Sequence, residues 1–431
     1  MNLEGLYTWV MRDRRTSIND LLPAIRRHLK RDKIRLYTPG AAAEPLALAA
    51  ALTADPDLAE GVQFVGVWIP GVNRIDWARF GEGGETTFAS PDWSMSLQDS
   101  RMKIHPLTYT QTYEWLGRTP LDAAIVHTSP PDQDGQCNLS LTVDFAAALL
   151  ERDIPLVGLF NPELPIVLGA PSVPMDRFTW IVEASHSPPV YDPGADDAVT
   201  VSVAQKAAEL IPDGAFIQTG IGKLGAAILS ELSGRRRLKI YSGLAADSVL
   251  DLIESGALAS DKGAITVGAI LGSPRLWTAL SRERRLIMAP VSQTHGFAHL
   301  SRLNGLAAVN SAIEIDLFGQ ANAEHAGGRL RSGVGGLSDF LRGAAHAPGG
   351  IPILALPAET PDGRHSRIVA QLPQGVVTLA RTEVAYVVTE YGAVDLRNLD
   401  LDGRARALIA IAAPSRRASL EADWVKLRSR L

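Results

Sequence analysis

Cysteine is almost absent from this sequence of 431 residues. The single cysteine, Cys137, excludes an intramolecular disulfide framework, and a lone thiol fits the reducing cytoplasm. A basic excess is missing too, because 42 Lys and Arg stand against 47 Asp and Glu, a formal net charge of −5. A general nucleic-acid-binding protein usually carries a strong basic excess, so we expect no nucleic-acid partner.

Long apolar runs are also missing. The most apolar stretch, Leu46 to Ala54, is too short to span a bilayer. The N-terminal residues contain no apolar core of signal-peptide length behind a basic start. We therefore expect a soluble, cytoplasmic protein without a membrane partner.

Two families of catalytic motif are absent as well. The nine histidines are scattered, no H-E-x-x-H occurs, and one cysteine cannot build a thiolate cage, so no metal site is expected. The sequence also contains no G-x-S-x-G, which removes the main support for a serine hydrolase.

Short β-like runs alternate with helical runs along the chain, which predicts an α/β fold with mainly parallel sheets. In the first half we expect strands at 34–37 and 62–69 and a helix at 41–52. The length exceeds what one core usually holds, and the Pro-, Ser- and Asp-rich segment 184–197 suits a boundary. We therefore expect two similar α/β domains, 1–190 and 191–431.

A glycine motif follows a predicted strand in the second half. Gly220 to Gly225 match G-x-G-x-x-G between the strand 215–219 and a helix that ends at Leu232. An NAD site would also need an acid at the end of the next strand, 238–241, and the nearest acid is Asp247. An NAD-dependent oxidoreductase thus stays a competitor of another class, and tight helix packing is an equally good explanation. An anion site, such as one for a CoA pyrophosphate, would use Gly220, Ile221, Gly222 and Lys223.

A second glycine cluster lies at 332–340, ahead of a predicted helix. Its glycines allow backbone amides to approach a ligand, so Gly335 and Gly336 are candidate oxyanion donors, with Asp339 nearby. An ordinary flexible turn explains the cluster equally well.

Polar side chains interrupt two apolar stretches near the C-terminus. The alternation around Ile315 predicts a strand that is followed by further polar residues, which resembles the wall of a polar cleft. Taken singly, each of these residues is more often structural than catalytic. The candidates are Asn310, Glu314, Asp316, Glu324 and, after the apolar run 385–388, Glu390.

Taken in order, seven segments resemble the acetyl-CoA hydrolase/4-hydroxybutyrate CoA-transferase family. They are SPPDQDGQCNLSLTVDF, NPELPIVLG, FIQTGIGKLGAAIL, AVNSAIEIDLFGQANAE, SGVGGLSDFLRGA, SRIV and VVTEYGAVDLR. The resemblance implies two CoA-transferase-like α/β domains, with coenzyme A bound mainly by the C-terminal one. It also implies an acyl-CoA substrate, a small carboxylate as possible acceptor, and a homodimer or larger homo-oligomer.

The sequence departs from this family at one position. The family's transferases carry a catalytic glutamate after the strand that follows the G-I-G helix, and this chain has Gly243 there. A carboxylate can attack an acyl-CoA and then hold CoA as a glutamyl thioester, whereas glycine cannot. The transferase mechanism therefore does not carry over to position 243.

Three interpretations remain open. In the first, water hydrolyses a small acyl-CoA, Gly335, Gly336 and Gln218 stabilise the oxyanion, and Glu390 or Glu324 acts as the base. In the second, another carboxylate is the nucleophile of a transferase, with Glu324, Glu390 and Asp247 as candidates. In the third, the chain binds acyl-CoA without catalysis. Ser242 is a weaker candidate nucleophile, because no histidine is evidently placed to activate it.

Overall fold

The computed structural model describes residues 14–373 and 375–430. These residues form two compact units, and the main division falls between Tyr191 and Asp192. Two segments depart from chain order, because Leu107–Thr110 groups with the second unit and Gly268–Pro290 with the first. The N-terminal residues on which the expectation of no signal peptide rests lie outside the described part.

The first unit is built on a seven-stranded sheet in which all strand pairs are parallel. Its strands, in spatial order, are β4 (Met102–Ile104), β3 (Gly83–Thr86), β2 (Val62–Val65), β1 (Ile34–Tyr37), β5 (Ala123–Thr128), β7 (Leu156–Phe160) and β9 (Trp180–Glu183). A separate antiparallel pair joins β6 (Gln136–Asn138) and β8 (Ser172–Pro174).

Two elements of the first unit differ from the prediction. The expected helix 41–52 is divided into a 3-10 turn, Ala41–Ala43, and α3 (Leu46–Ala54). Pro45 precedes α3, and a proline lacks the N–H that a helix interior requires. The expected strand 62–69 is shorter and ends at Val65. The next residue, Gly66, packs so closely that an added Cβ would lie 2.4 Å from the carbonyl oxygen of Thr38.

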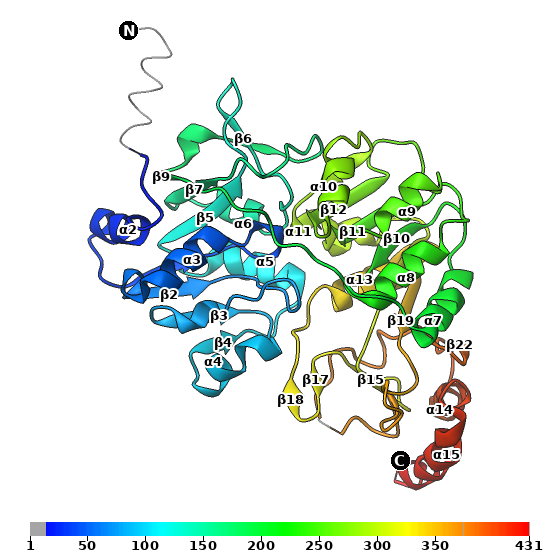
Figure 1. Cartoon of the computed structure of the whole chain (residues 1–431). Helices are drawn as coiled ribbons and strands as arrows, with labels where there is room; N and C mark the ends of the chain where they lie inside the picture. The colour runs from blue at the N-terminus through cyan, green and yellow to red at the C-terminus, as the bar shows by residue number, and fades with distance from the viewer. Residues whose placement is uncertain (1–13, 374, 431) are drawn as a thin grey trace. The chain divides into compact units, whose positions relative to one another are not determined.

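The helices of the first unit lie around its sheet (Figure 1). They are α2 (Leu21–Leu29), α3, α4 (Ser94–Gln98), α6 (Ala146–Leu150) and α5 (Tyr109–Arg118), whose first two residues group with the second unit. The helix α10 (Pro274–Ser281), from the segment Gly268–Pro290, also groups with the first unit. The core of this unit contains three fully buried tryptophans, Trp68, Trp77 and Trp93, whose rings are stacked or in edge contact.

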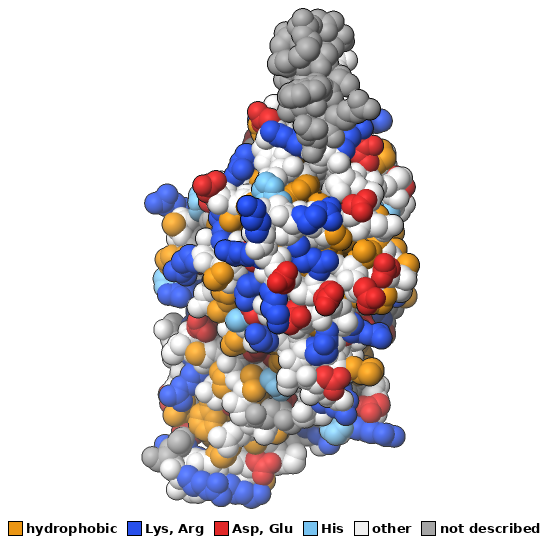
Figure 2. Space-filling view, turned by 90° about the vertical axis from the view of Figure 1, so that its left-hand side faces the viewer, with side chains coloured by type: hydrophobic (Ala, Val, Ile, Leu, Met, Phe, Trp, Pro, Cys, Tyr) orange, Lys and Arg blue, Asp and Glu red, His pale blue; other side chains and the backbone are white. Residues whose placement is uncertain are grey.

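Basic and acidic side chains are interspersed on the face shown in Figure 2. Several basic residues of the first unit are paired with acids, as in Arg31–Asp122 and Lys33–Glu82. Among the described helices, none combines the length and the apolar character that crossing a bilayer would require.

The second sheet has eight strands. Their spatial order is β13 (Leu286–Met288), β12 (Ile265–Ile270), β11 (Lys239–Ala245), β10 (Phe216–Thr219), β14 (Leu306–Asn310), β19 (Ile351–Ala355), β21 (Tyr386–Thr389) and β22 (Gly392–Asp395). β10 is parallel to β11 and β14, and only β22 is seen to run antiparallel to its neighbour, β21. The predicted α/β class with mainly parallel sheets is confirmed.

The second unit also contains helices and two groups of short strands (Figure 1). The helices are α7 (Ala198–Glu209), α8 (Lys223–Glu231), α9 (Val249–Glu254), α11 (Val291–Thr294), α12 (Phe297–Leu300), α13 (Leu337–His346), α14 (Leu401–Ala410) and α15 (Pro414–Arg428). The short strands are β15 (Glu314–Asp316), β16 (Ala321–Asn322), β17 (His325–Ala326), β18 (Arg329–Leu330) and β20 (Ile368–Val369).

The strand expected to end at Tyr241 continues to Ala245 as β11. Gly243 therefore lies within a strand, so its two flanking residues are held by the sheet. A predicted strand around Ile315 is present as β15, but Asp316 is fully buried. Its carboxylate accepts hydrogen bonds from the backbone N–H groups of Phe318 and Gln320, so it organises the following turn.

Candidate active site

The G-x-G-x-x-G segment forms a tight turn between β10 and α8. Gly222 has φ of +121°, a conformation that favours glycine, and it immediately precedes Lys223 at the start of α8. Gly225 has a packing role, because an added Cβ would lie 2.1 Å from the carbonyl oxygen of Gly220. The Lys223 side chain lies against Gly194 and lowers the pKa of Asp197, after the larger effect of the Thr200 backbone N–H.

Two of the predicted residues form a buried amide pair beside this turn. The Gln218 side chain lies against that of Asn310 on the neighbouring strand β14, and the two amides exchange hydrogen bonds of 2.8 and 3.3 Å. An added Cβ on Gly220 would lie 3.4 Å from Oδ1 of Asn310. The pair therefore fixes two strand ends next to the glycine turn.

A histidine that the sequence did not single out lies against Gly243. An added Cβ on Gly243 would lie 2.8 Å from Cε1 and 3.0 Å from Nε2 of His295. An added Cβ on Gly336 would lie 2.5 Å from the same Nε2. Real Cβ atoms do not approach this closely, so the imidazole occupies the space that a side chain at either position would need.

His295 is enclosed by aromatic rings and a hydroxyl group. Its ring centroid is 4.8 Å from that of Tyr109 and 4.5 Å from that of Phe340. Its Nδ1 lies 2.9 Å from Oγ1 of Thr294. Burial lowers the pKa of His295 to about 3, so the imidazole is neutral near pH 7.

The Nε2 edge of His295 is the polar part that faces the glycines. In the described part of the chain, no hydrogen bond reaches this atom, yet it is not one of the fully enclosed polar atoms without a partner. Gly243 and Gly336 are themselves partly exposed. The imidazole edge thus lies next to two partly exposed residues that have no side chains.

The predicted oxyanion segment is held by residues from far upstream. The carbonyl oxygen of Gly335 accepts a hydrogen bond of 3.1 Å from the N–H of Tyr109. The carboxylate of Asp339 accepts hydrogen bonds from both the N–H and the hydroxyl group of Thr110. Burial raises the pKa of Asp339, and the Thr110 hydrogen bonds oppose this rise. Asp339 thereby anchors the turn that contains Gly335 and Gly336.

The two candidate bases have other partners. Glu324 accepts a hydrogen bond of 2.8 Å from the hydroxyl group of Thr378, and Glu390 accepts one of 2.9 Å from the N–H of Ala358. No hydrogen bond or ion pair within the described residues joins either acid to His295. The structure therefore brings together Gly243, Gly336 and His295, and separately Gln218, Asn310 and Gly220.

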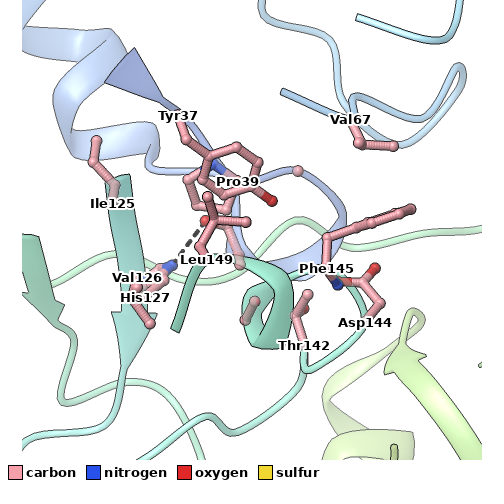
Figure 3. Close-up of a pocket in the computed structure, with 13 residues that line it drawn as sticks. Tyr37, Pro39, Val67, Ile125, Val126, His127, Thr142, Asp144, Phe145 and Leu149 are labelled. Carbon is pink, nitrogen blue, oxygen red and sulfur yellow. Dashed lines mark hydrogen bonds between the residues drawn. The ribbon is translucent and has the colours of Figure 1, made fainter. Parts of the chain in front are cut away.

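A small cavity in the first unit contains a second group of titratable residues (Figure 3). It lies near the ends of β1 and β5, and its lining includes Tyr37, His127 and Asp144. Nδ1 of His127 is 3.1 Å from the carbonyl oxygen of Ala43, and burial lowers the pKa of this histidine to about 3. Burial also raises the pKa of Asp144 to about 7. The space suits about one water molecule, being about 20 Å³.

His295 was missed because nothing in its local sequence, VSQTHGFAHL, marks a functional site. The signal in the sequence was Gly243, because a glycine inside a strand often marks a close approach by another group. Within the part of the chain that is described, no group of His, Cys, Asp and Glu side chains has the arrangement of a metal site.

Known proteins resemble this chain over most of its length. Residues 272–424 match the family described as acetyl-CoA hydrolase/transferase C-terminal domain. The 4-hydroxybutyrate coenzyme A transferase of Clostridium kluyveri is 34% identical over 315 residues, which cover 72% of this chain and 73% of the relative. An acetyl-CoA hydrolase of Kluyveromyces lactis is 29% identical over 369 residues, which cover 74% and 69%.

The fold comparison covers almost the whole chain. The crystal structure of RipA from Yersinia pestis has a TM-score of 0.89 and is 23% identical, covering 99% of this chain and 100% of that one. At this low identity, the structural similarity shows a shared fold. The sequence relatives show common ancestry. Together with the ordered motifs, the 34% identity over more than two thirds of both chains is decisive. The chain belongs to the acetyl-CoA hydrolase/4-hydroxybutyrate CoA-transferase family.

Proposed function

We propose that this protein hydrolyses a small acyl-CoA thioester, with water as the acyl acceptor. The family supplies the substrate class, because its relatives are a coenzyme A transferase and an acetyl-CoA hydrolase by name. Membership of the family alone leaves both reactions open. The choice between hydrolysis and transfer depends on which group attacks the acyl carbon.

The proposal depends on what lies at and beside position 243. Transfer through an enzyme-bound intermediate requires a carboxylate that forms an anhydride and then a thioester with CoA. Gly243 provides no such group, and Cε1 of His295 lies only 2.8 Å from where a Cβ at residue 243 would be. With no enzyme carboxylate at this position, water is the simplest remaining nucleophile.

The reaction balances without a cofactor. The oxygen of water bonds to the acyl carbon, the carbon–sulfur bond breaks, and the electron pair leaves with sulfur. The hydroxyl group stays on the acyl product and the second hydrogen of water ends on the CoA thiol. The developing oxyanion would be stabilised by main-chain donors of the Gly335–Gly336 segment, a contribution worth ~3 kcal/mol for one good donor.

The binding of coenzyme A is assigned to the second unit. The turn at Gly220–Gly222 precedes the N-terminus of α8, and Ile221 is exposed there. The amides of such a turn suit a pyrophosphate or a thioester oxygen. Asp339 holds the neighbouring glycine segment in place through Thr110.

The direct test measures free thiol from acetyl-CoA and from longer acyl-CoA esters without any added acid. We expect thiol release, and in ¹⁸O-labelled water we expect one labelled oxygen in the carboxylate product. If thiol release stays at the background rate while CoA moves to added acetate or butyrate, the protein is a transferase and the proposal fails.

A binding experiment separates the remaining alternatives. Calorimetric titration with CoA should show saturable binding, and the same titration with NAD should show none. If CoA binds while neither reaction occurs, the chain is a non-catalytic binder. If NAD binds and CoA does not, the oxidoreductase alternative replaces the proposal.

A further inference from the structure

We propose that His295 is a catalytic residue that donates a hydrogen bond from Nε2 to the thioester carbonyl oxygen, in the space that the missing carboxylate would need. This inference rests on the proposed function and deepens it. It names a residue that interacts with the acyl group and explains why two glycines, from β11 and from the segment before α13, are required around it.

The geometry makes the two glycines and the imidazole interdependent. Gly243 and Gly336 both lie against Nε2, since added Cβ atoms would be 3.0 and 2.5 Å from that atom. No residue larger than glycine fits at either position unless the ring moves. Because neither glycine has a side chain, the proposal places the small acyl group beside these two residues, next to Nε2.

The neighbours of His295 favour a neutral donor. Thr294 lies at Nδ1, so its hydroxyl group can donate there, which leaves the ring proton on Nε2. The other contacts are the rings of Tyr109 and Phe340. Burial lowers the pKa of His295, and among the described residues no hydrogen bond or ion pair joins its ring to a charged group.

A donor of this kind and a general base would behave differently. A base must accept a proton from water, and the resulting imidazolium would be buried between aromatic rings without a counter-ion, which is costly. A neutral N–H that points toward a developing negative charge has no such cost. His295 therefore acts by stabilising charge on the carbonyl oxygen, and no proton passes through it.

The decisive variants are His295→Ala and His295→Gln, measured with full-length protein. Glutamine retains an N–H at a reach similar to that of Nε2, whereas alanine does not. We expect kcat to fall ~100- to 1,000-fold in His295→Ala and by less than about tenfold in His295→Gln, with KM changed little in both. His299→Ala is the matched control, because His299 is an exposed residue of the adjacent helix α12 and should leave kcat unchanged.

The pH dependence and the glutamine variant together test the role of His295. With a neutral donor, kcat/KM of the wild type should show no ionisation of a histidine between about pH 5.5 and 8. An ionisation in this range that disappears in His295→Gln would show that the imidazole is not the neutral group that burial predicts, and a base would leave His295→Gln as inactive as His295→Ala. Either of these results overturns the inference.

A spectroscopic measurement keeps the inference testable apart from hydrolysis. Acetyl-dethia-CoA, in which a methylene replaces sulfur, keeps the carbonyl group and cannot be hydrolysed at that bond. Its carbonyl stretch should move to lower frequency in the wild type and in His295→Gln and return to the free value in His295→Ala. If the wild type shows the shift but releases no thiol, the proposed function fails while the contact stands. If the shift persists in His295→Ala, the inference fails.

Discussion

Gln218 of β10 and Asn310 of β14 exchange two side-chain hydrogen bonds, of 2.8 and 3.3 Å, across adjacent parallel strands. Both residues are buried, so each amide depends on the other for its hydrogen bonds. Replacing either residue by alanine should lower the free energy of unfolding by ~1–3 kcal/mol, because one buried amide loses its partner. Denaturant titration of both single variants and the double variant gives the coupling.

The double variant decides whether the pair is a unit. We expect it to lose less than the sum of the two single losses, because no unpaired amide remains. Gln205→Ala, at an exposed position on α7, is the control and should change stability by less than ~0.5 kcal/mol. Strict additivity of the two single losses would show that the amides do not depend on each other.

Thr294 should matter through the orientation of His295. Thr294→Val keeps the shape of the side chain but removes the hydroxyl group that lies 2.9 Å from Nδ1. We expect kcat for thioester hydrolysis to fall about tenfold, because the ring proton is no longer directed to Nε2. Thr294→Ser retains the hydroxyl group and should keep most of the activity, so equal losses in both variants would argue for a purely packing role.

A glutamate at position 243 should support CoA transfer only when the His295 imidazole is also removed. In Gly243→Glu the new Cβ would lie 2.8 Å from Cε1 of His295, so we expect a loss of ~1–3 kcal/mol in stability and no transferase activity. Adding His295→Ala should recover part of the stability and allow CoA to move to added acetate. Mass spectrometry of the trapped double variant should find CoA on the peptide that contains residue 243.

Gly117→Glu is the matched control for this charge and size, because an added Cβ at Gly117 meets no atom within 4 Å. That variant should remain as stable as the wild type. Should Gly243→Glu alone fold normally and transfer CoA, the imidazole would not be the obstacle that the distances indicate.

Asp144 should make the stability of the protein depend on pH. Burial raises its pKa from 3.8 to about 7, so between these values the folded state holds a proton that the unfolded chain releases. The free energy of unfolding should therefore fall as pH rises from about 4 to 7, by at most ~4 kcal/mol from this residue. Asp144→Asn should flatten the profile measured by denaturant titration from pH 4.5 to 8.

Glu44 contributes in the same direction, because burial raises its pKa to about 7, so Asp144→Asn should remove only part of the slope. Asp57→Asn, at an exposed position, is the control and should keep the wild-type profile. A wild-type profile that rises across this range would contradict the assignment.

The sequence predicted the fold class well because alternation and glycine turns are local signals. β1, β10 and α13 were expected close to where they occur. The helix at 41–52 was wrong because Pro45 interrupts it, and β11 was expected to be four residues shorter at its end. Boundaries of this kind depend on neighbours in space rather than on the local pattern.

The candidate site was less predictable for the same reason. Gly243 drew attention only because a carboxylate is missing there, and the sequence could not show what replaces it. His295 comes 52 residues later along the chain and meets Gly243 through the packing of a loop on a strand. The partner of Asp339 was equally hidden, because Thr110 lies 229 residues upstream.

The short stretch Leu107–Thr110 has a consequence for anyone who wishes to divide this protein. A gene truncated to start at Asp192 would encode the second unit without Tyr109 and Thr110, which bond to Gly335 and Asp339. Such a fragment would leave the turn ahead of α13 without its tether and one face of the His295 ring uncovered. The two units are consequently interlaced along the chain, and neither can be expressed whole by a single cut.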